Sequence, residues 1–147
     1  ERAITEFAGF VMVLSPQFPE ERKAEMAGKY PWLELMQGVP SLVPLVRSAE
    51  AIVCTYGNIA YESLSCGKPT YLAGYLPFQN EYSSYLEEKG LATNLGLFDK
   101  LDSMKVEMLF NPARRAELAA RAQVEIVRSG IEAIADLLMT QLSSTNS

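Results

Sequence analysis

Short apolar runs alternate with charged or amphipathic stretches along this chain, and this alternation limits the fold more than any other feature. The apolar runs predict strands at 10–14, 33–36, 51–54, 70–73 and 92–95. The stretches between them predict helices at 20–29, 41–48, 58–66 and 79–89. Strands that are joined by helices pair in parallel through right-handed crossovers. The sequence therefore predicts an α/β fold, a Rossmann-like parallel sheet with helices on both faces.

The two ends of the chain are expected to be helical. A helix is expected over residues 1–8, ended by Gly9, and helical sequence runs from Ser103 to about residue 142 with breaks near Pro112 and Gly130. The apolar positions of this C-terminal part are expected in the core, at Leu118, Ala122, Ile126, Ile131, Ile134 and Leu138. We expect one domain over residues 1–142 and a disordered polar tail over 143–147.

The expected order of elements begins with a helix, whereas a Rossmann-like half begins with a strand and a Gly-rich turn. We therefore expect that the first strand of the sheet is missing and that the chain is the C-terminal part of a longer protein. The missing strand would be central, so its loss would leave open edges. Whether another chain completes the sheet stays open.

Composition excludes several classes of function. The formal net charge of -5 argues against a nucleic-acid partner, and no apolar run is long enough for a membrane span. Histidine is absent, which removes the commonest general base and metal ligand, so we expect no catalytic residue and no metal site. Cys54 and Cys66 lack the spacing of a zinc or redox motif and read as free thiols. The opening residues do not resemble a signal peptide, and a cytoplasmic location is predicted.

The segment from Cys54 to Glu62 combines a strand end, a glycine turn and a helix start. Ligands of open α/β sheets bind at such strand ends, where helix amides and the positive end of the helix dipole face an anion. Glu62 follows within the first turns of the helix, in reach of a ligand's hydroxyls. The pattern favours a nucleotide sugar. The alternative is that Gly57 is an ordinary turn residue between a strand and a helix and that Glu62 is a solvated helical acid.

Several motifs in this order resemble the C-terminal nucleotide-sugar-binding domain of GT-B glycosyltransferases. The chain is similar to glycosyltransferase family 28, and most of all to the UDP-sugar hydrolases of pseudaminic acid and spore-coat polysaccharide synthesis. The segment from Gly57 to Glu62 resembles their G-S-T-T-W-E motif, and Gly67-Lys68-Pro69 resembles the G-L-P that follows. Gln79 resembles a Gln that both groups have just after the next strand.

The resemblance implies the roles of individual residues in binding a UDP-sugar. Backbone groups of Gly38 and Val39 would contact uracil, and the amides of Gly57, Asn58 and Ile59 would face the diphosphate. Glu62 would accept hydrogen bonds from the ribose, and Gln79 and Asn80 would meet the sugar. Tyr56 stands where the family has a small residue, which would narrow the mouth of the pocket.

At the level of the whole protein, the resemblance implies a donor-binding domain of a glycosyltransferase or nucleotide-sugar hydrolase, without a cofactor. The resemblance implies that such a domain is inactive alone, because the N-terminal domain of these enzymes supplies the catalytic base and the acceptor site. The identity of the nucleotide base, the identity of the sugar, and the choice between transfer and hydrolysis stay open.

A second hypothesis is a non-catalytic, degenerate domain that acts as an assembly module, for example as a homodimer. Its motivation is a set of aromatic residues, Tyr61, Tyr71, Tyr75, Phe78, Tyr82 and Tyr85, since tyrosine is favoured at interfaces. Arginines over 114–128 alternate with glutamates, which predicts a solvated face and at most peripheral membrane contact. A response-regulator-like domain is disfavoured, because no Asp pair follows the early strands.

Overall fold

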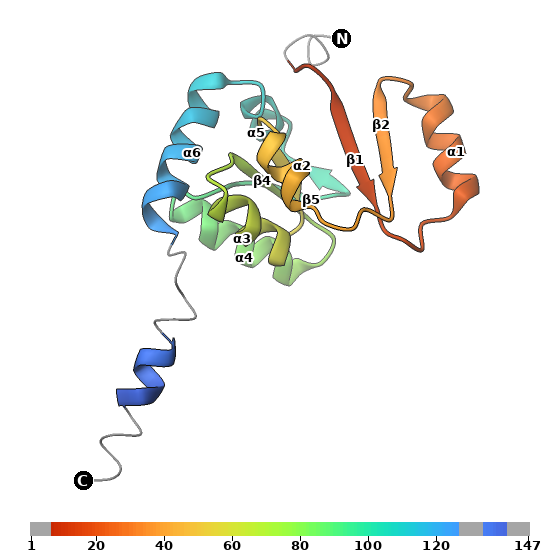
Figure 1. Cartoon of the computed structure of the whole chain (residues 1–147). Coiled ribbons are helices and arrows are strands. Elements are labelled where there is room, and N and C mark those ends of the chain that lie inside the picture. Colours follow the sequence, from red (N-terminus) through yellow and green to blue (C-terminus); the bar gives the residue numbers. More distant parts are fainter. Residues whose placement is uncertain (1–6, 127–133, 141–147) are drawn as a thin grey trace. The chain divides into compact units, whose positions relative to one another are not determined.

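The protein has an α/β fold in which helices flank parallel strands, as expected for a Rossmann-like domain (Figure 1). The structure, a computed structural model, describes residues 7–126 and 134–140. The chain divides into two compact units, Glu1–Leu45 and Val46–Ser147. Each unit carries its own sheet.

The first unit is a strand–helix–strand motif. Strand β1 (Phe10–Leu14) and strand β2 (Leu33–Gln37) pair in parallel, and helix α1 (Glu20–Lys29) connects them. Helix α1 begins after Pro19 with acidic side chains in its first turn and ends on a basic one, in agreement with the helix dipole. Among the described residues, β1 pairs with β2 alone.

The expectation that β1 is covered on both faces is wrong for its middle three residues. Val11, Met12 and Val13 are each at least 40% exposed, and only Leu14 is buried. Side chains of β1 lie on the faces of its sheet, and helix α1 packs mainly against β2, so the faces of β1 stay largely uncovered within this unit. The apolar sequence does not reveal this exposure.

The second unit is a four-stranded sheet in the order β3-β4-β5-β6. Its strands are β3 (Ile52–Cys54), β4 (Thr70–Gly74), β5 (Thr93–Leu97) and β6 (Lys100–Leu101). The first three are parallel, and β6 turns back antiparallel to β5. The helices are α2 (Val43–Ser48), which crosses the boundary between the units, α3 (Asn58–Ser65), α4 (Pro77–Glu88), α5 (Ser103–Met108) and α6 (Pro112–Glu125).

Strand β4 is the centre of the second unit, because all five of its residues are buried. Leu72 packs in one cluster with residues of three helices, namely Ala60 and Leu64 of α3, Leu86 of α4 and Ala122 of α6. Tyr71 points to the opposite face, and its hydroxyl donates to the backbone oxygen of Met108 in α5 at 3.2 Å. Helices therefore cover both faces of this strand, as the sequence predicts.

Two features of the sheets differ from the sequence-based expectation. The strands form two sheets instead of one, and the short strand β6 lies in a segment for which the sequence predicts no strand. The apolar strand at 51–54 is not buried throughout, since Val53 is 53% exposed. The helix start expected at Ser103 is confirmed, since Asp102 caps α5 by accepting from the amides of Met104 and Lys105.

The expected core positions of the C-terminal part are confirmed in α6 and wrong at two positions beyond it, where the expected helix is present. Leu118 and Ala122 are buried, and Ile126 packs against the core. Residues 134–140 are helical, but Ile134 and Leu138 are exposed instead of buried. Residues 7 and 8, the end of the helix expected over 1–8, form a bend and are not helical. The rest of that helix, Ile131, the break near Gly130 and the tail 143–147 lie outside the described residues. No helix in the described part of the chain is long and apolar enough to cross a membrane.

Candidate functional site

The turn from β3 into α3 has a backbone conformation that requires glycine. Gly57 has φ 155° and ψ -162°, a region that is essentially closed to residues with a Cβ. Its carbonyl oxygen accepts from the amide of Ala60 at 3.0 Å, which closes the first turn. No side chain caps α3, and the amides of Asn58 and Ile59 have no acceptor within the helix. Helix N-termini with uncapped amides are the kind of site at which proteins bind anions.

Glu62 lies on α3, one turn beyond these amides, and its side chain is exposed. Its backbone oxygen accepts from the amide of Cys66 at the end of the helix, so the carboxylate is held on a short, fixed element. Exposure is required for contact with a ligand's hydroxyls. A solvated acid has the same exposure, so both interpretations of Glu62 fit this geometry.

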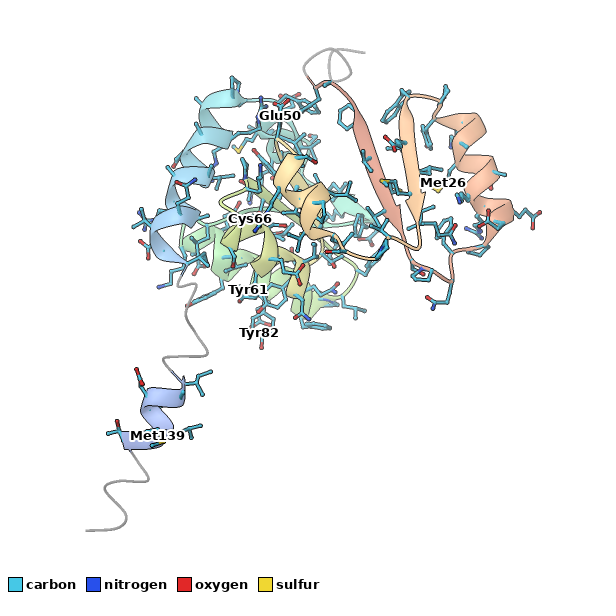
Figure 2. All side chains as sticks on the ribbon, viewed as in Figure 1. Met26, Glu50, Tyr61, Cys66, Tyr82 and Met139 are labelled. Carbon is cyan, nitrogen blue, oxygen red and sulfur yellow. The ribbon has the colours of Figure 1, made fainter. Side chains whose placement is uncertain are left out.

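Tyr56 stands beside the turn at the centre of an aromatic cluster. Its ring stacks on that of Tyr82 in α4, with centroids 5.0 Å apart and planes at 15°. Its hydroxyl lies 3.2 Å from that of Tyr61 in α3, and the two rings meet edge to face. This hydrogen bond, followed by burial, raises the pKa of Tyr61 to about 12. Figure 2 shows Tyr61 and Tyr82 close together, on the outer side of α3 and α4.

Gln79 uses its side-chain oxygen within the protein. The Oε1 atom accepts from the amides of Tyr75 and Leu76, at 2.8 and 3.2 Å, and so closes the turn between β4 and α4. Gln79 lies at the predicted strand end, but any contact with a ligand would have to come from its Nε2 atom.

Asn80 also makes an internal contact. Its Oδ1 atom accepts from Nδ2 of Asn94 at 3.0 Å, which ties α4 to β5. Asn94 is only 6% exposed, and its own Oδ1 accepts from the amide of Gly96, where the register between β4 and β5 shifts. Sequence reasoning missed Asn94, although a polar residue inside a short buried strand is a detectable signal.

Gly38 and Val39 directly follow β2 in the first unit, and Gly38 turns the chain with φ +68°. The other seven predicted residues belong to the second unit. There the carboxyl end of β3 leads to Tyr56 and α3, and that of β4 leads to α4 with Gln79 and Asn80. The tyrosine contacts bring α3 and α4 together at this edge.

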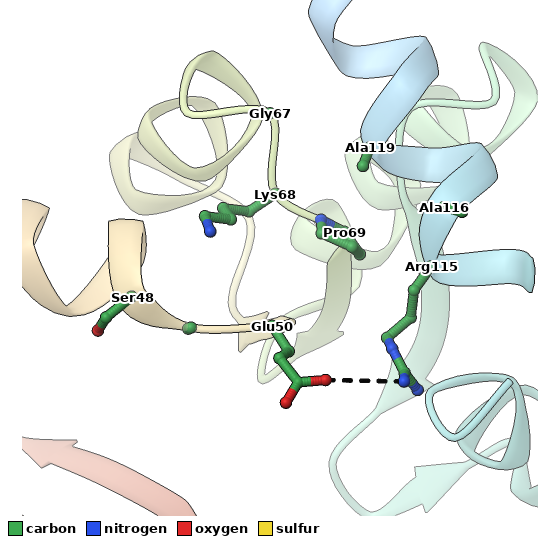
Figure 3. Close-up of a pocket in the computed structure, with 9 residues that line it drawn as sticks. Ser48, Glu50, Gly67, Lys68, Pro69, Arg115, Ala116 and Ala119 are labelled. Atoms are coloured by element: carbon green, nitrogen blue, oxygen red, sulfur yellow. Dashed lines mark ion pairs between the residues drawn. The ribbon is translucent and has the colours of Figure 1, made fainter. Parts of the chain in front are cut away.

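A separate hollow of about 400 Å³ lies near the amino ends of β3 and β4 (Figure 3). Glu50 precedes β3, Lys68 precedes β4, and Arg115 of α6 approaches Glu50 to 3.8 Å. The second guanidinium nitrogen of Arg115 donates to the backbone oxygen of Leu109. This arrangement joins α6 to the sheet and lies at the opposite ends of these strands from the predicted site.

The described residues contain no group of three or more His, Cys, Asp or Glu that could hold a metal ion. Cys54 and Cys66 are free, and burial raises the pKa of the Cys54 thiol to about 12. No protein-family model matches the chain, and no characterised protein is significantly similar to it. Function is therefore inferred from residues and geometry.

Proposed function

We propose that the second unit binds a nucleotide sugar, a UDP-sugar, at the N-terminus of α3. It would be the donor-binding domain of a glycosyltransferase or nucleotide-sugar hydrolase that acts in the cytoplasm on the synthesis of cell-surface polysaccharide. The observation that carries the proposal is the uncapped start of α3 after Gly57, with the exposed carboxylate of Glu62 one turn away.

The two features have complementary chemistry. Unpaired amides and the positive end of the helix dipole attract a diphosphate, and they stabilise the charge that develops when the nucleotide departs. A carboxylate repels phosphate but accepts hydrogen bonds from a ribose diol, so Glu62 would orient the nucleoside instead of the phosphates. The contribution of this unit is positioning and charge stabilisation. The sequence has no histidine, the commonest general base, so a catalytic base in this unit would have to be another residue type such as a carboxylate.

Calorimetric titration with UDP and with UDP-N-acetylglucosamine, without added metal, tests the proposal. Glu62→Ala should weaken UDP binding by about 1.5–3 kcal/mol, or roughly 10- to 150-fold in Kd, the usual contribution of a hydrogen bond to a charged group. Glu81→Ala is the matched control, because Glu81 is also an exposed helical acid but lies on α4. Equal dissociation constants for the wild type and Glu62→Ala would remove Glu62 from the site.

Thermal stability in the presence of UDP, CDP and dTDP tests the choice of base. A ligand at one hundred times its Kd stabilises the folded state by about 2.7 kcal/mol. A shift with UDP compounds alone would support the uridine assignment, and equal shifts with all three would contradict it.

A second candidate function, an assembly module, is favoured by a stripe of aromatic residues on α4. Phe78, Tyr82 and Tyr85 follow one another at helical spacing on α4, Tyr75 lies just before the helix, and each of the four is at least half exposed. Tyr71, which belonged to the same hypothesis, is buried and is a core residue. Light scattering separates the two functions, because a stable dimer that is indifferent to UDP would favour assembly.

A further inference from the structure

The two side chains that were expected to recognise the sugar of the proposed donor use their oxygen atoms within the protein. The Oε1 atom of Gln79 accepts from two backbone amides, and the Oδ1 atom of Asn80 accepts from Asn94. A sugar is bound by polar groups for its hydroxyls and by flat apolar surface for its C–H faces. Acceptors and apolar ring surface for the sugar are therefore sought in other residues near the start of α3.

The tyrosine cluster of Tyr56, Tyr61 and Tyr82 has both kinds of surface and adjoins the proposed phosphate site. Tyr56 directly precedes Gly57, and Tyr61 directly precedes Glu62. Tyr82 lies on α4, one turn beyond Gln79. Three separate elements thus place three phenol rings at the same edge of the sheet.

The cluster is already ordered before a ligand arrives. The ring of Tyr56 is fixed by the stack on Tyr82 and by the hydrogen bond to Tyr61, and it packs against the core. Tyr61 and Tyr82 remain 42% and 50% exposed, so ring surface is available at the outside of the cluster. Binding to rings that are already fixed costs little conformational entropy.

The chemistry of the cluster suits a neutral, hydroxyl-rich ring. In the pair of Tyr56 and Tyr61, one hydroxyl donates to the other, and the accepting hydroxyl keeps its own proton for an external acceptor. The raised pKa of Tyr61 keeps its hydroxyl protonated at neutral pH. The faces of phenol rings carry negative partial charge and attract the weakly positive C–H groups of a pyranose.

We propose that Tyr56, Tyr61 and Tyr82 form the subsite for the pyranose ring of the nucleotide sugar. The inference rests on the proposed function, because it needs the diphosphate at the start of α3. Tyr82 supplies ring surface, and the hydroxyls of Tyr56 and Tyr61 bind sugar hydroxyls. The cluster thereby takes over the role expected of Gln79 and Asn80.

The test compares the Kd of UDP with the Kd values of UDP-glucose and UDP-N-acetylglucosamine in the wild type and in Tyr82→Ala. The variant should lose about three- to tenfold in affinity for both UDP-sugars and keep the wild-type Kd for UDP, because only the sugar touches the ring. Tyr85→Ala is the control, since Tyr85 is a tyrosine of similar exposure one turn further along α4. It should bind all three ligands as the wild type does.

Tyr56→Phe is a second variant that keeps the stack on Tyr82 and removes one hydroxyl of the pair. It should weaken the UDP-sugars severalfold and leave UDP unchanged. If UDP and the UDP-sugars bind but both variants keep the wild-type ratio of the Kd values, the sugar subsite is overturned and the proposed function stands. If the wild type binds none of the three ligands, both proposals fall.

Discussion

Replacing Gly57 by alanine should destabilise the second unit, although the added methyl group has room. An ideal Cβ at this position meets no atom within 4 Å, so the substitution produces no clash with neighbouring residues. The cost comes from the backbone, because φ 155° with ψ -162° is essentially available to glycine alone. Such strain costs about 1–3 kcal/mol.

Part of this cost is offset in the unfolded state. Alanine restricts the unfolded chain more than glycine does, which favours folding by about 0.4–1 kcal/mol. The net loss for Gly57→Ala is therefore about 0.5–2 kcal/mol, and the melting temperature should fall by roughly 1–8 °C for a chain of this size. The strained residue also opens α3, so nucleotide binding should weaken together with stability.

Gly28→Ala provides the same chemical change with the opposite expected sign. Gly28 lies in the last turn of α1, and an added Cβ there also meets nothing within 4 Å outside the helix. Alanine at this helical position should stabilise by at most about 0.5–1 kcal/mol, the value for a helix interior.

Urea unfolding can be followed separately in the two units by tryptophan and tyrosine fluorescence. The single tryptophan, Trp32, lies in the first unit, and all but one of the seven tyrosines lie in the second. A Gly57→Ala protein whose second unit is as stable as the wild type would refute the strain argument.

Other predictions concern a buried hydrogen-bonding side chain, a helix cap and the titration of a buried thiol. Asn94→Ala should destabilise the second unit by about 2–4 kcal/mol in urea unfolding, because it leaves the amide of Gly96 and Oδ1 of Asn80 without partners. Asn111→Ala, which removes only the exposed cap of α6, should cost about 0.5–2 kcal/mol, and equal losses would contradict the burial argument. Because the pKa of Cys54 is raised from 9.0 to about 12, its folded thiol keeps a proton that the unfolded thiol loses. The contribution of this thiol to the free energy of unfolding is therefore fully present below about pH 9 and is lost as the pH rises to about 12. Cys54→Ala should make the free energy of unfolding depend less on pH between these two values. An unchanged alkaline slope would show that the thiol is not the titrating group.

Local elements could be predicted from the sequence because their signals are local. The expected helix at 20–29 coincides with α1, and the Asp102 cap follows from a residue type that satisfies amides two and three positions ahead. The break before α6 follows in the same way, since Pro112 stands at the first helical position after an Asn cap.

Pairing between distant segments could not be predicted in the same way. An apolar run such as 10–14 indicates a strand but not how many neighbours it has, so the division into two sheets and the exposure of Val11 were missed. The contacts that shape the candidate site could not be predicted from the sequence for a related reason. The contacts of Asn80 with Asn94 and of Tyr56 with Tyr82 join residues far apart in the chain, and neither partner's sequence context reveals the other.

The unpaired edge of β1 has a consequence for the behaviour of the protein in solution. The segment Phe10–Leu14 carries no charge, proline or glycine, and its middle residues are exposed. Segments of this composition can stack on copies of themselves into cross-β assemblies, and natural proteins usually guard such edges with lysine, proline or a bulge. We therefore expect self-association at high protein concentration to begin at β1, a strand that contributes little to the buried core.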